Sequence, residues 1–142
     1  MQADGQGSDI ASIWAPQINK IDGRWYIYAT CAKNSSDSAK RLPYVWVGGE
    51  EPTDPYTYHG TIDNYDPEVA IYLSPRFIEY GGQRYICNGG FYRESDRTGH
   101  QQSLFITKLA TPTAFEGKPA PILWRTCLKS TFPTRDLTLP EL

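Results

Sequence analysis

The chain has 142 residues, about the length of one ordinary domain, and its 14 Lys and Arg against 16 Asp and Glu give a net charge of −2. This balance supplies no basic surface for nucleic acid, and no apolar run approaches the ~18 residues that a membrane span needs. The 10 Tyr, 5 Phe and 4 Trp, together with 12 Gly and 11 Pro, favour short strands joined by tight turns over a helical bundle. We therefore expect an all-β protein that binds neither nucleic acid nor a membrane.

The chain opens with a lead-in, residues 1–12, which lacks the charged and apolar regions of a secretory signal peptide. The unit that follows, about 13–70, contains four β-rich runs at 17–21, 24–29, 42–47 and 56–62. Asp22-Gly23 separates the first two runs and has the residues that a type I′ hairpin turn requires.

The plan is repeated in a second unit, about 71–127, with runs at 76–80, 83–88, 103–108 and 115–123 and a Gly81-Gly82 turn. The two units match residue by residue at a separation of 59 positions, which places Pro16 on Pro75, Gly23 on Gly82, Tyr26 on Tyr85 and Ile27 on Ile86. The last residues, 128–142, lack a strand pattern and are interpreted as an irregular tail.

A repeated four-stranded antiparallel sheet is typical of β-propeller blades, about 4 to 8 of which close a ring. Two units are too few for closure. The sequence therefore predicts a partial β-propeller made of two consecutive blades.

Three cysteines, Cys31, Cys87 and Cys127, have no spacing typical of metal ligands. We interpret them as small buried apolar residues. One disulfide is the alternative, and the sequence does not select the pair.

The run Ile-Trp-Ala-Pro-Gln-Ile at 13–18, with Lys-Ile-Asp-Gly-Arg-Trp-Tyr-Ile-Tyr at 20–28, resembles glycoside hydrolase family 43. The likeness extends over about residues 13–126. It implies the second and third blades of a five-bladed propeller that hydrolyses arabinofuranosyl or xylosyl linkages in plant-type polysaccharides. The family is expected to be extracellular and needs no cofactor for this chemistry.

In this family an Asp base, a Glu acid and a second Asp that tunes the acid come from different blades, because acid and base must face each other across the sugar. The resemblance places the base before this chain's first unit and the acid after its second. The tuning Asp, normally in Asp-Gly-Thr, falls on Ser74-Pro75-Arg76, and Ser74 cannot supply its negative charge. Asp66 and Glu68 are possible substitutes, although solvated loop charge is the preferred interpretation for both.

We therefore expect no catalytic residue in this chain and regard Trp14, Gln17 and Ser74 as candidate substrate-binding residues. Gln17 replaces the usual carboxylate after Trp-Ala-Pro, and Trp14 either stacks on a sugar or packs between blades. His59 and His100 stand alone in sequence, so we expect surface histidines and no metal site. The leading hypothesis is an incomplete family 43 glycosidase, inactive alone; the alternatives are a noncatalytic carbohydrate-binding or interaction module and a truncated gene product.

Overall fold

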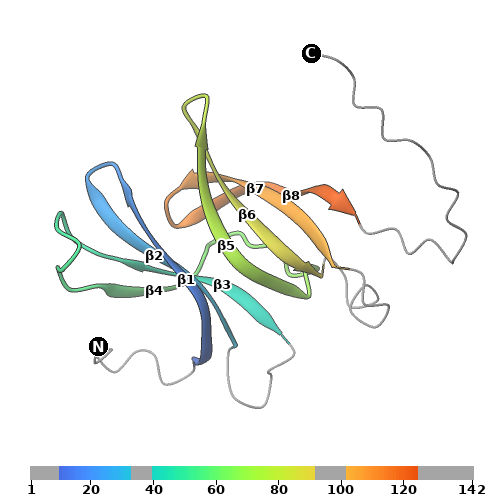
Figure 1. Ribbon diagram of the computed structural model, residues 1–142, viewed down its shortest axis with the longest axis horizontal. Coiled ribbons are helices and arrows are strands. Elements are labelled where there is room, and N and C mark those ends of the chain that lie inside the picture. Colours follow the sequence, from blue (N-terminus) through green and yellow to red (C-terminus); the bar gives the residue numbers. More distant parts are fainter. Residues whose placement is uncertain (1–9, 33–39, 92–101, 125–142) are drawn as a thin grey trace, which may run out of the picture.

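A computed structural model describes residues 10–32, 40–91 and 102–124 of the chain, and these form eight β-strands and no helix (Figure 1). The all-β prediction and all eight predicted strand locations are confirmed. The strands are β1 (Ala11–Ile21), β2 (Arg24–Ala32), β3 (Arg41–Val47), β4 (Thr57–Thr61), β5 (Ile71–Tyr80), β6 (Gln83–Phe91), β7 (Ser103–Thr111) and β8 (Ala114–Trp124). Within the described residues, no helix is long and apolar enough to span a membrane.

Two tight turns set the first hairpin of each half. Asp22 and Gly23 have φ values of 50° and 81°, and Gly81 and Gly82 have 57° and 72°. Positive φ at both central residues is the requirement of a type I′ turn, whose twist matches that of the flanking strands. The two predicted hairpins are confirmed.

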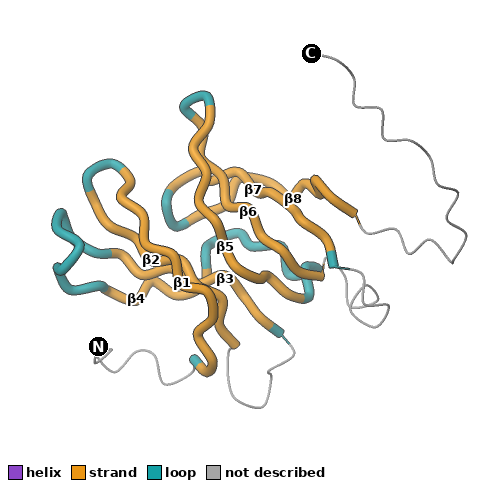
Figure 2. Tube along the Cα trace, in the orientation of Figure 1, coloured by secondary structure: helices purple, strands orange, loops and turns teal. Residues whose placement is uncertain are grey.

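The eight strands form one sheet in the order β1-β2-β3-β5-β6-β7-β8, with β4 paired to β3. It divides into two four-stranded antiparallel halves, which we call sheet 1 (β1 to β4) and sheet 2 (β5 to β8) (Figure 2). A single parallel bridge between Arg41 of β3 and Ile71 of β5 joins them. β5 also contacts β1 and β2, so the first strands of the two sheets lie close together. We call β1 and β5 the inner strands.

The repeat is visible in the strand pairing. Ile18 pairs with Ile27 in sheet 1, and Phe77 pairs with Ile86 in sheet 2, as the 59-residue separation predicts. The third strands differ, because Ile27 pairs with Trp46 whereas Ile86 pairs with Thr107, two positions later than the sequence match implies. A shift of two residues keeps each side chain on the same face of its sheet, so the two faces remain equivalent.

The core lies between the sheets and is largely aromatic. The Tyr28 ring of sheet 1 stacks on Phe77 of β5 with ring centroids 6.5 Å apart, and Tyr72 contacts Phe105 and Phe115 within sheet 2. Tyr28 and Tyr72 have no exposed surface. Burying such large apolar surfaces is the main favourable contribution to joining the two sheets.

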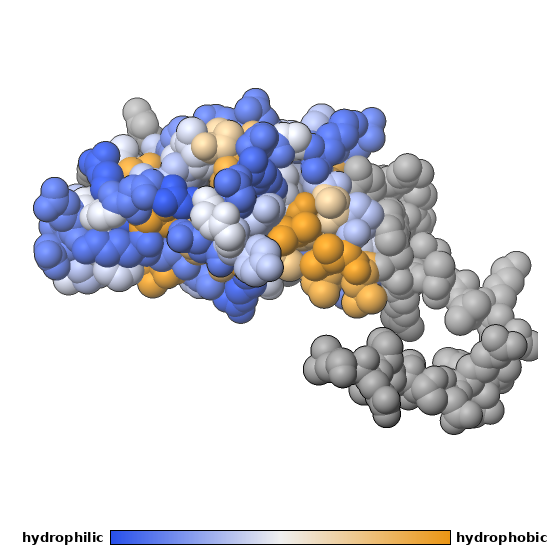
Figure 3. All heavy atoms as spheres, turned by 90° about the horizontal axis from the view of Figure 1, so that it is seen from above, coloured by the Kyte–Doolittle hydropathy of each residue, from blue (hydrophilic) through white to orange (hydrophobic). Residues whose placement is uncertain are grey.

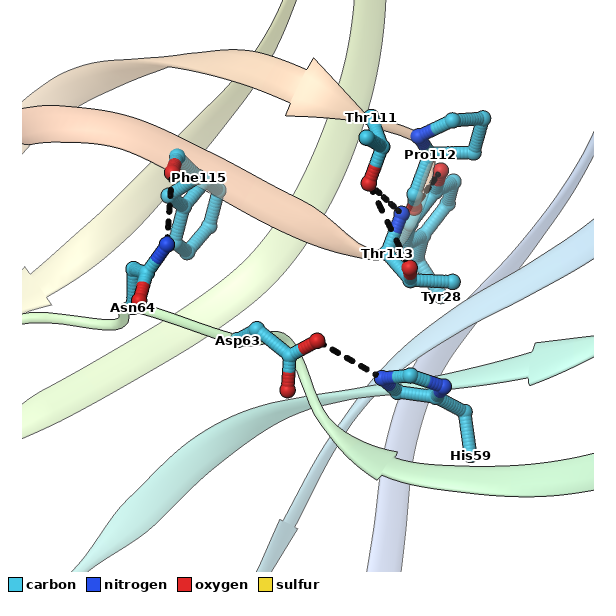
Figure 4. Close-up of polar contacts among 8 residues, drawn as sticks. All are labelled: Tyr28, His59, Asp63, Asn64, Thr111, Pro112, Thr113 and Phe115. Atoms are coloured by element: carbon cyan, nitrogen blue, oxygen red, sulfur yellow. Dashed lines mark hydrogen bonds and ion pairs between the residues drawn. The ribbon is translucent and has the colours of Figure 1, made fainter.

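Polar contacts close one rim of this interface, where the β4–β5 connection meets the β7–β8 turn (Figure 4). The Asp63 N–H donates to the Thr113 carbonyl at 2.8 Å, and the Phe115 N–H donates to the Asp63 carbonyl at 2.9 Å. The Tyr28 hydroxyl donates to the Pro112 carbonyl at 2.7 Å. These bonds pair backbone N–H and carbonyl groups that would otherwise lack a hydrogen-bond partner at the interface.

The cysteine prediction is confirmed for Cys31, which is buried and free; burial raises the pKa of its thiol to about 12. Cys87 is also free but only half-buried, on the outer side of sheet 2. Cys127 lies outside the described residues, as does the predicted tail 128–142.

Candidate functional site

Both inner strands carry a β-bulge at the same place in the repeat. The pairing slips between Trp14 and Gln17 in β1 and between Leu73 and Arg76 in β5, so each strand gains one residue relative to its partner. Ala15 and Ser74, the residues before the two prolines, have φ values of 45° and 50°. Left-handed backbone at a non-glycine residue costs about 1 to 3 kcal/mol and is found mostly where a chain is shaped for function.

Trp14 lies at the bulge of β1, and the residue is 49% exposed. The guanidinium of Arg41 lies over the indole, with Cζ 3.2 Å from the ring centroid. Arg41 itself is only 5% exposed, and its Nη1 donates to the Ser12 carbonyl at 3.2 Å. One face of Trp14 is therefore held by a buried cation, while about half of the residue remains open to a ligand.

Gln17 contacts the neighbouring inner strand. Its Oε1 accepts a hydrogen bond from the Phe77 N–H at 2.9 Å. The side chain thus links β1 to β5 through an acceptor oxygen. The carboxylate expected at this position would also provide an acceptor oxygen, but it would carry a negative charge that Gln17 lacks.

Ser74 is exposed at the β5 bulge and lines an open groove of about 680 Å³ on the outer side of sheet 2. Arg76, Gly89, Leu104 and Leu123 are among its other lining residues. A hydroxyl here can donate or accept a hydrogen bond, but it cannot hold a charge that would shift the pKa of an acid.

The interpretation of Asp66 as solvated loop charge is wrong, since only 5% of its side chain is exposed. Its Oδ1 accepts from the Glu68 N–H at 3.0 Å, and its Oδ2 lies 3.9 Å from the Lys118 ammonium of β8. The turn that Asp66 forms, and the Tyr72 hydroxyl bonded to its backbone, bury the carboxylate. The Asp66 carboxylate therefore faces Lys118 on β8, the outermost strand of sheet 2. Glu68 is exposed, as expected.

The inner strands carry one carboxylate, Glu79, which lies at the hairpin end of β5 and pairs with Arg84 at 3.4 Å. Proton transfer across a glycosidic bond needs two carboxyl groups about 6.5 to 9.5 Å apart. The described parts of the inner strands do not supply such a pair at the bulges. Nor do three or more His, Cys, Asp or Glu side chains gather anywhere in the described residues to form a metal site.

His59 has 31% of its side chain exposed and lies 3.3 Å from Asp63, so its surface placement is confirmed (Figure 4). His100 lies outside the described residues. Arg41 was missed by the sequence reasoning, because a single Arg at the start of a strand carries no signal that a Trp 27 positions earlier will stack on it.

The comparisons with known proteins agree with this geometry. The model of glycosyl hydrolases family 43 matches residues 1–136. The chain belongs to glycosyl hydrolase family 43. This match confirms the resemblance inferred from the Trp-Ala-Pro segment. Family 43 enzymes are glycosidases.

Two curated relatives are 31% identical to the chain. An extracellular exo-α-(1→5)-L-arabinofuranosidase of Streptomyces avermitilis matches 113 residues, which are 79% of this chain and 22% of the relative. α-L-arabinofuranosidase 43 of Humicola insolens matches 117 residues, 82% of this chain and 23% of the relative. The chain thus spans less than a quarter of the length of either relative.

Two solved structures share the fold. The α-L-arabinofuranosidase of Lactobacillus brevis has a TM-score of 0.67 and 23% identity, over 82% of this chain and 38% of its own. The endo-arabinase of Bacteroides thetaiotaomicron has a TM-score of 0.63 and 19% identity, over 80% of this chain and 38% of its own. The two sheets are therefore the partial propeller that the repeat predicted.

Proposed function

We propose that the two sheets belong to a protein that acts on arabinofuranosyl or xylosyl linkages of plant-type polysaccharides, and that they contribute sugar contacts rather than proton transfer. The names of the curated relatives support the arabinose specificity, and the family supports hydrolysis of O-glycosyl bonds. The word extracellular in the name of the Streptomyces avermitilis relative supports the same location for this protein.

The observation that carries this proposal is the half-exposed Trp14 indole held by buried Arg41 on an inner strand. The C–H groups of a furanose or pyranose ring suit such an aromatic face. A ring already held in place loses little conformational freedom when a sugar stacks on it, which favours binding. Gln17 and Ser74, at and next to the two bulges, offer neutral hydrogen-bonding groups for sugar hydroxyls.

Because the described inner strands hold no acid–base pair, we expect that these sheets do not cleave a glycosidic bond by themselves. Ser74 in place of Asp removes the charge that would raise the pKa of a neighbouring acid. A noncatalytic carbohydrate-binding module is the second candidate function, favoured by the same pair of facts: a neutral Ser74 and an exposed Trp14.

Calorimetric titration of arabinoxylan oligosaccharides tests the sugar contact. We expect binding by the chain and its loss in Trp14→Ala, because the stacking face is removed. Tyr80→Ala is the matched control, since Tyr80 is a 79% exposed aromatic residue at the far tip of the β5–β6 hairpin. No heat with the wild-type chain, or equal binding by the Trp14 variant, would contradict the proposal.

A further inference from the structure

The halves of the inner strands that carry the bulges contain no carboxylate. Residues 11–18 of β1 have no charged side chain, and residues 71–78 of β5 have one, Arg76. The two positions at which the family resemblance expects a carboxylate hold the neutral side chains of Gln17 and Ser74. These segments therefore do not repel a negatively charged ligand.

Arg41 adds a positive charge at the same end of the sheet. It pairs with Ile71 at the start of β5, and its guanidinium Cζ lies 3.2 Å from the centroid of the Trp14 ring. Arg41 is only 5% exposed, so water screens its charge weakly. Within the described part of the chain, its guanidinium forms no ion pair with a carboxylate. The positive charge beneath the indole is therefore not neutralised by these residues.

The described carboxylates of residues 10–32 and 40–61 lie at the opposite end of sheet 1. Asp22 is in the β1–β2 turn, and the β3–β4 loop, which is hydrogen-bonded to Trp25 beside that turn, carries Glu50, Glu51 and Asp54. Figure 3 shows hydrophilic residues over this end of the molecule. Trp14 lies about 20 Å from the turn along the strand, well beyond the ~8 Å over which physiological salt screens exposed charges. These carboxylates therefore do not offset Arg41.

Most described carboxylates of the β4–β5 connection and of sheet 2 face other basic side chains. Four have such a partner: Asp63 with His59, Asp66 with Lys118, Glu79 with Arg84 and Glu116 with Lys108. The fifth, Glu68, is exposed and precedes Ile71 by three residues. Arg41 and Arg76 together outweigh Glu68, so the described charge around Trp14 is positive on balance.

We propose that the Trp14 site selects a sugar that carries a carboxylate, a uronic acid unit of a plant-type polysaccharide, over a neutral sugar. The inference rests on the proposed sugar contact at Trp14. The guanidinium of Arg41 covers one face of the indole, so a sugar stacks on the opposite face. The cation attracts a carboxylate of the stacked sugar. It also reduces the negative potential of the open face, which the C–H groups of a neutral sugar prefer.

The size of the expected effect follows from the geometry. A sugar that stacks at the usual contact distance of about 3.5 to 4 Å holds its carboxylate roughly 7 to 9 Å from the Arg41 charge. At this separation, and with the partial screening of a half-exposed site, the Coulomb attraction corresponds to about a tenfold difference in Kd.

Calorimetric titration compares two forms of one probe with the purified chain. One form is a xylo-oligosaccharide with a glucuronic acid branch, and the other is the same molecule after reduction of its carboxylate to a primary alcohol. Arg41→Gln removes the charge and keeps a planar side chain, whereas Arg41→Lys keeps the charge. Arg24→Gln removes an exposed positive charge at the start of β2 and is the matched control. Circular dichroism checks the fold of each variant, and a salt series on the wild type needs no variant.

The wild type should bind the acidic form about tenfold more tightly than the reduced form, and the difference should shrink as salt is added. The preference should persist in the Arg41→Lys and Arg24→Gln variants and vanish in Arg41→Gln. A preference that survives Arg41→Gln, is lost in either of the other two variants or is insensitive to salt would overturn the inference.

The same titrations separate this inference from the proposed function. Equal binding of the two forms by the wild type, lost in Trp14→Ala, would overturn the charge preference and leave the sugar contact standing. Binding of neither form would overturn both.

Discussion

Arg41 and Trp14 form an unusual pair, because a buried guanidinium lies against a half-exposed indole with the Ser12 carbonyl as its hydrogen-bond acceptor. Among the described residues no carboxylate forms an ion pair with Arg41. Its cost of burial is offset by the aromatic face and the carbonyl. We infer that Arg41 is a positioning residue that fixes the orientation of Trp14.

Arg41→Lys should separate this positioning role from charge. The ammonium keeps the positive charge but loses the planar face that stacks on the indole. We expect sugar binding to weaken by about tenfold, as lost cation–π stacking allows. Arg24→Lys, at the exposed start of β2, is the control.

A fluorine resonance from 5-fluorotryptophan at position 14 gives a readout that does not depend on ligand. It should broaden or shift in the Arg41 variant and stay unchanged in the Arg24 variant. An unchanged resonance together with unchanged binding would show that Arg41 does not position Trp14.

The Asp22–Arg84 ion pair gives a pH-dependent contribution to stability. The hydrogen bonds from Arg84 hold the pKa of Asp22 below its ordinary value of 3.8. A carboxyl with a lower pKa in the folded protein stabilises the fold above the unfolded pKa and loses this effect as the pH falls through the folded pKa. The pair is exposed, so the contribution is small.

Asp22→Asn should therefore lower the urea midpoint slightly at neutral pH. The difference from the wild type should shrink once the pH falls below 3.8 and vanish at stronger acidity. A difference that is constant over this range, or one that grows on acidification, would show that the pair does not act through the Asp22 charge.

At the scale of the strands, two adjacent glycines in β6 differ in whether the structure leaves room for a side chain. Gly90 has a φ of 148°, and a Cβ added there would collide with the Ile71 carbonyl of β5. A Cβ at Gly89 would lie 3.7 Å from Leu104 Cδ2, which is an ordinary contact. The close approach of β5 and β6 therefore depends on Gly90 and not on Gly89.

Gly90→Ala should destabilise the chain by about 1 to 3 kcal/mol, because the β5–β6 pairing must shift to admit the methyl group. Gly89→Ala is the matched control and should cost much less. Urea denaturation of the two variants measures both values. Equal stability of the two variants would contradict the described backbone approach.

Most of the strand plan could be predicted from the sequence, because the alternating β-rich runs and the Asp22-Gly23 and Gly81-Gly82 turns report local structure. The two-residue register difference of β7 could not, since it depends on connections whose lengths differ between the units. The bulges at Ala15 and Ser74 were also missed, because they appear only when each inner strand is paired with its neighbour.

The candidate site was predictable only in part. Trp14, Gln17 and Ser74 stay predictions as binding residues, and they were selected because the Trp-Ala-Pro segment and the repeat gave their places. The burial of Asp66 and the stacking of Arg41 result from contacts between segments far apart in sequence. A pattern confined to one segment does not contain that information.

At the scale of the molecule, the chain consists of two equivalent sheets that pack face to face. A further sheet of the same kind could pack on either outer face in the same way. This explains why the core between the sheets is well buried while the two outer faces retain exposed Ile18 and Leu104. It also brings the inner strands together just after their bulges, where the Phe77 N–H donates to Gln17. The half-exposed Trp14 and the Gln17–Phe77 hydrogen bond both involve these strands, whereas their described parts hold no pair of carboxylates at the bulges.

The most direct test of this account is the turnover of nitrophenyl arabinofuranoside and nitrophenyl xyloside by the isolated chain. We predict no release of nitrophenol above the uncatalysed rate, either for the wild type or for Ser74→Asp, because one restored carboxylate does not make an acid–base pair. Turnover well above that rate, abolished by replacing a carboxylate within this chain, would contradict the account.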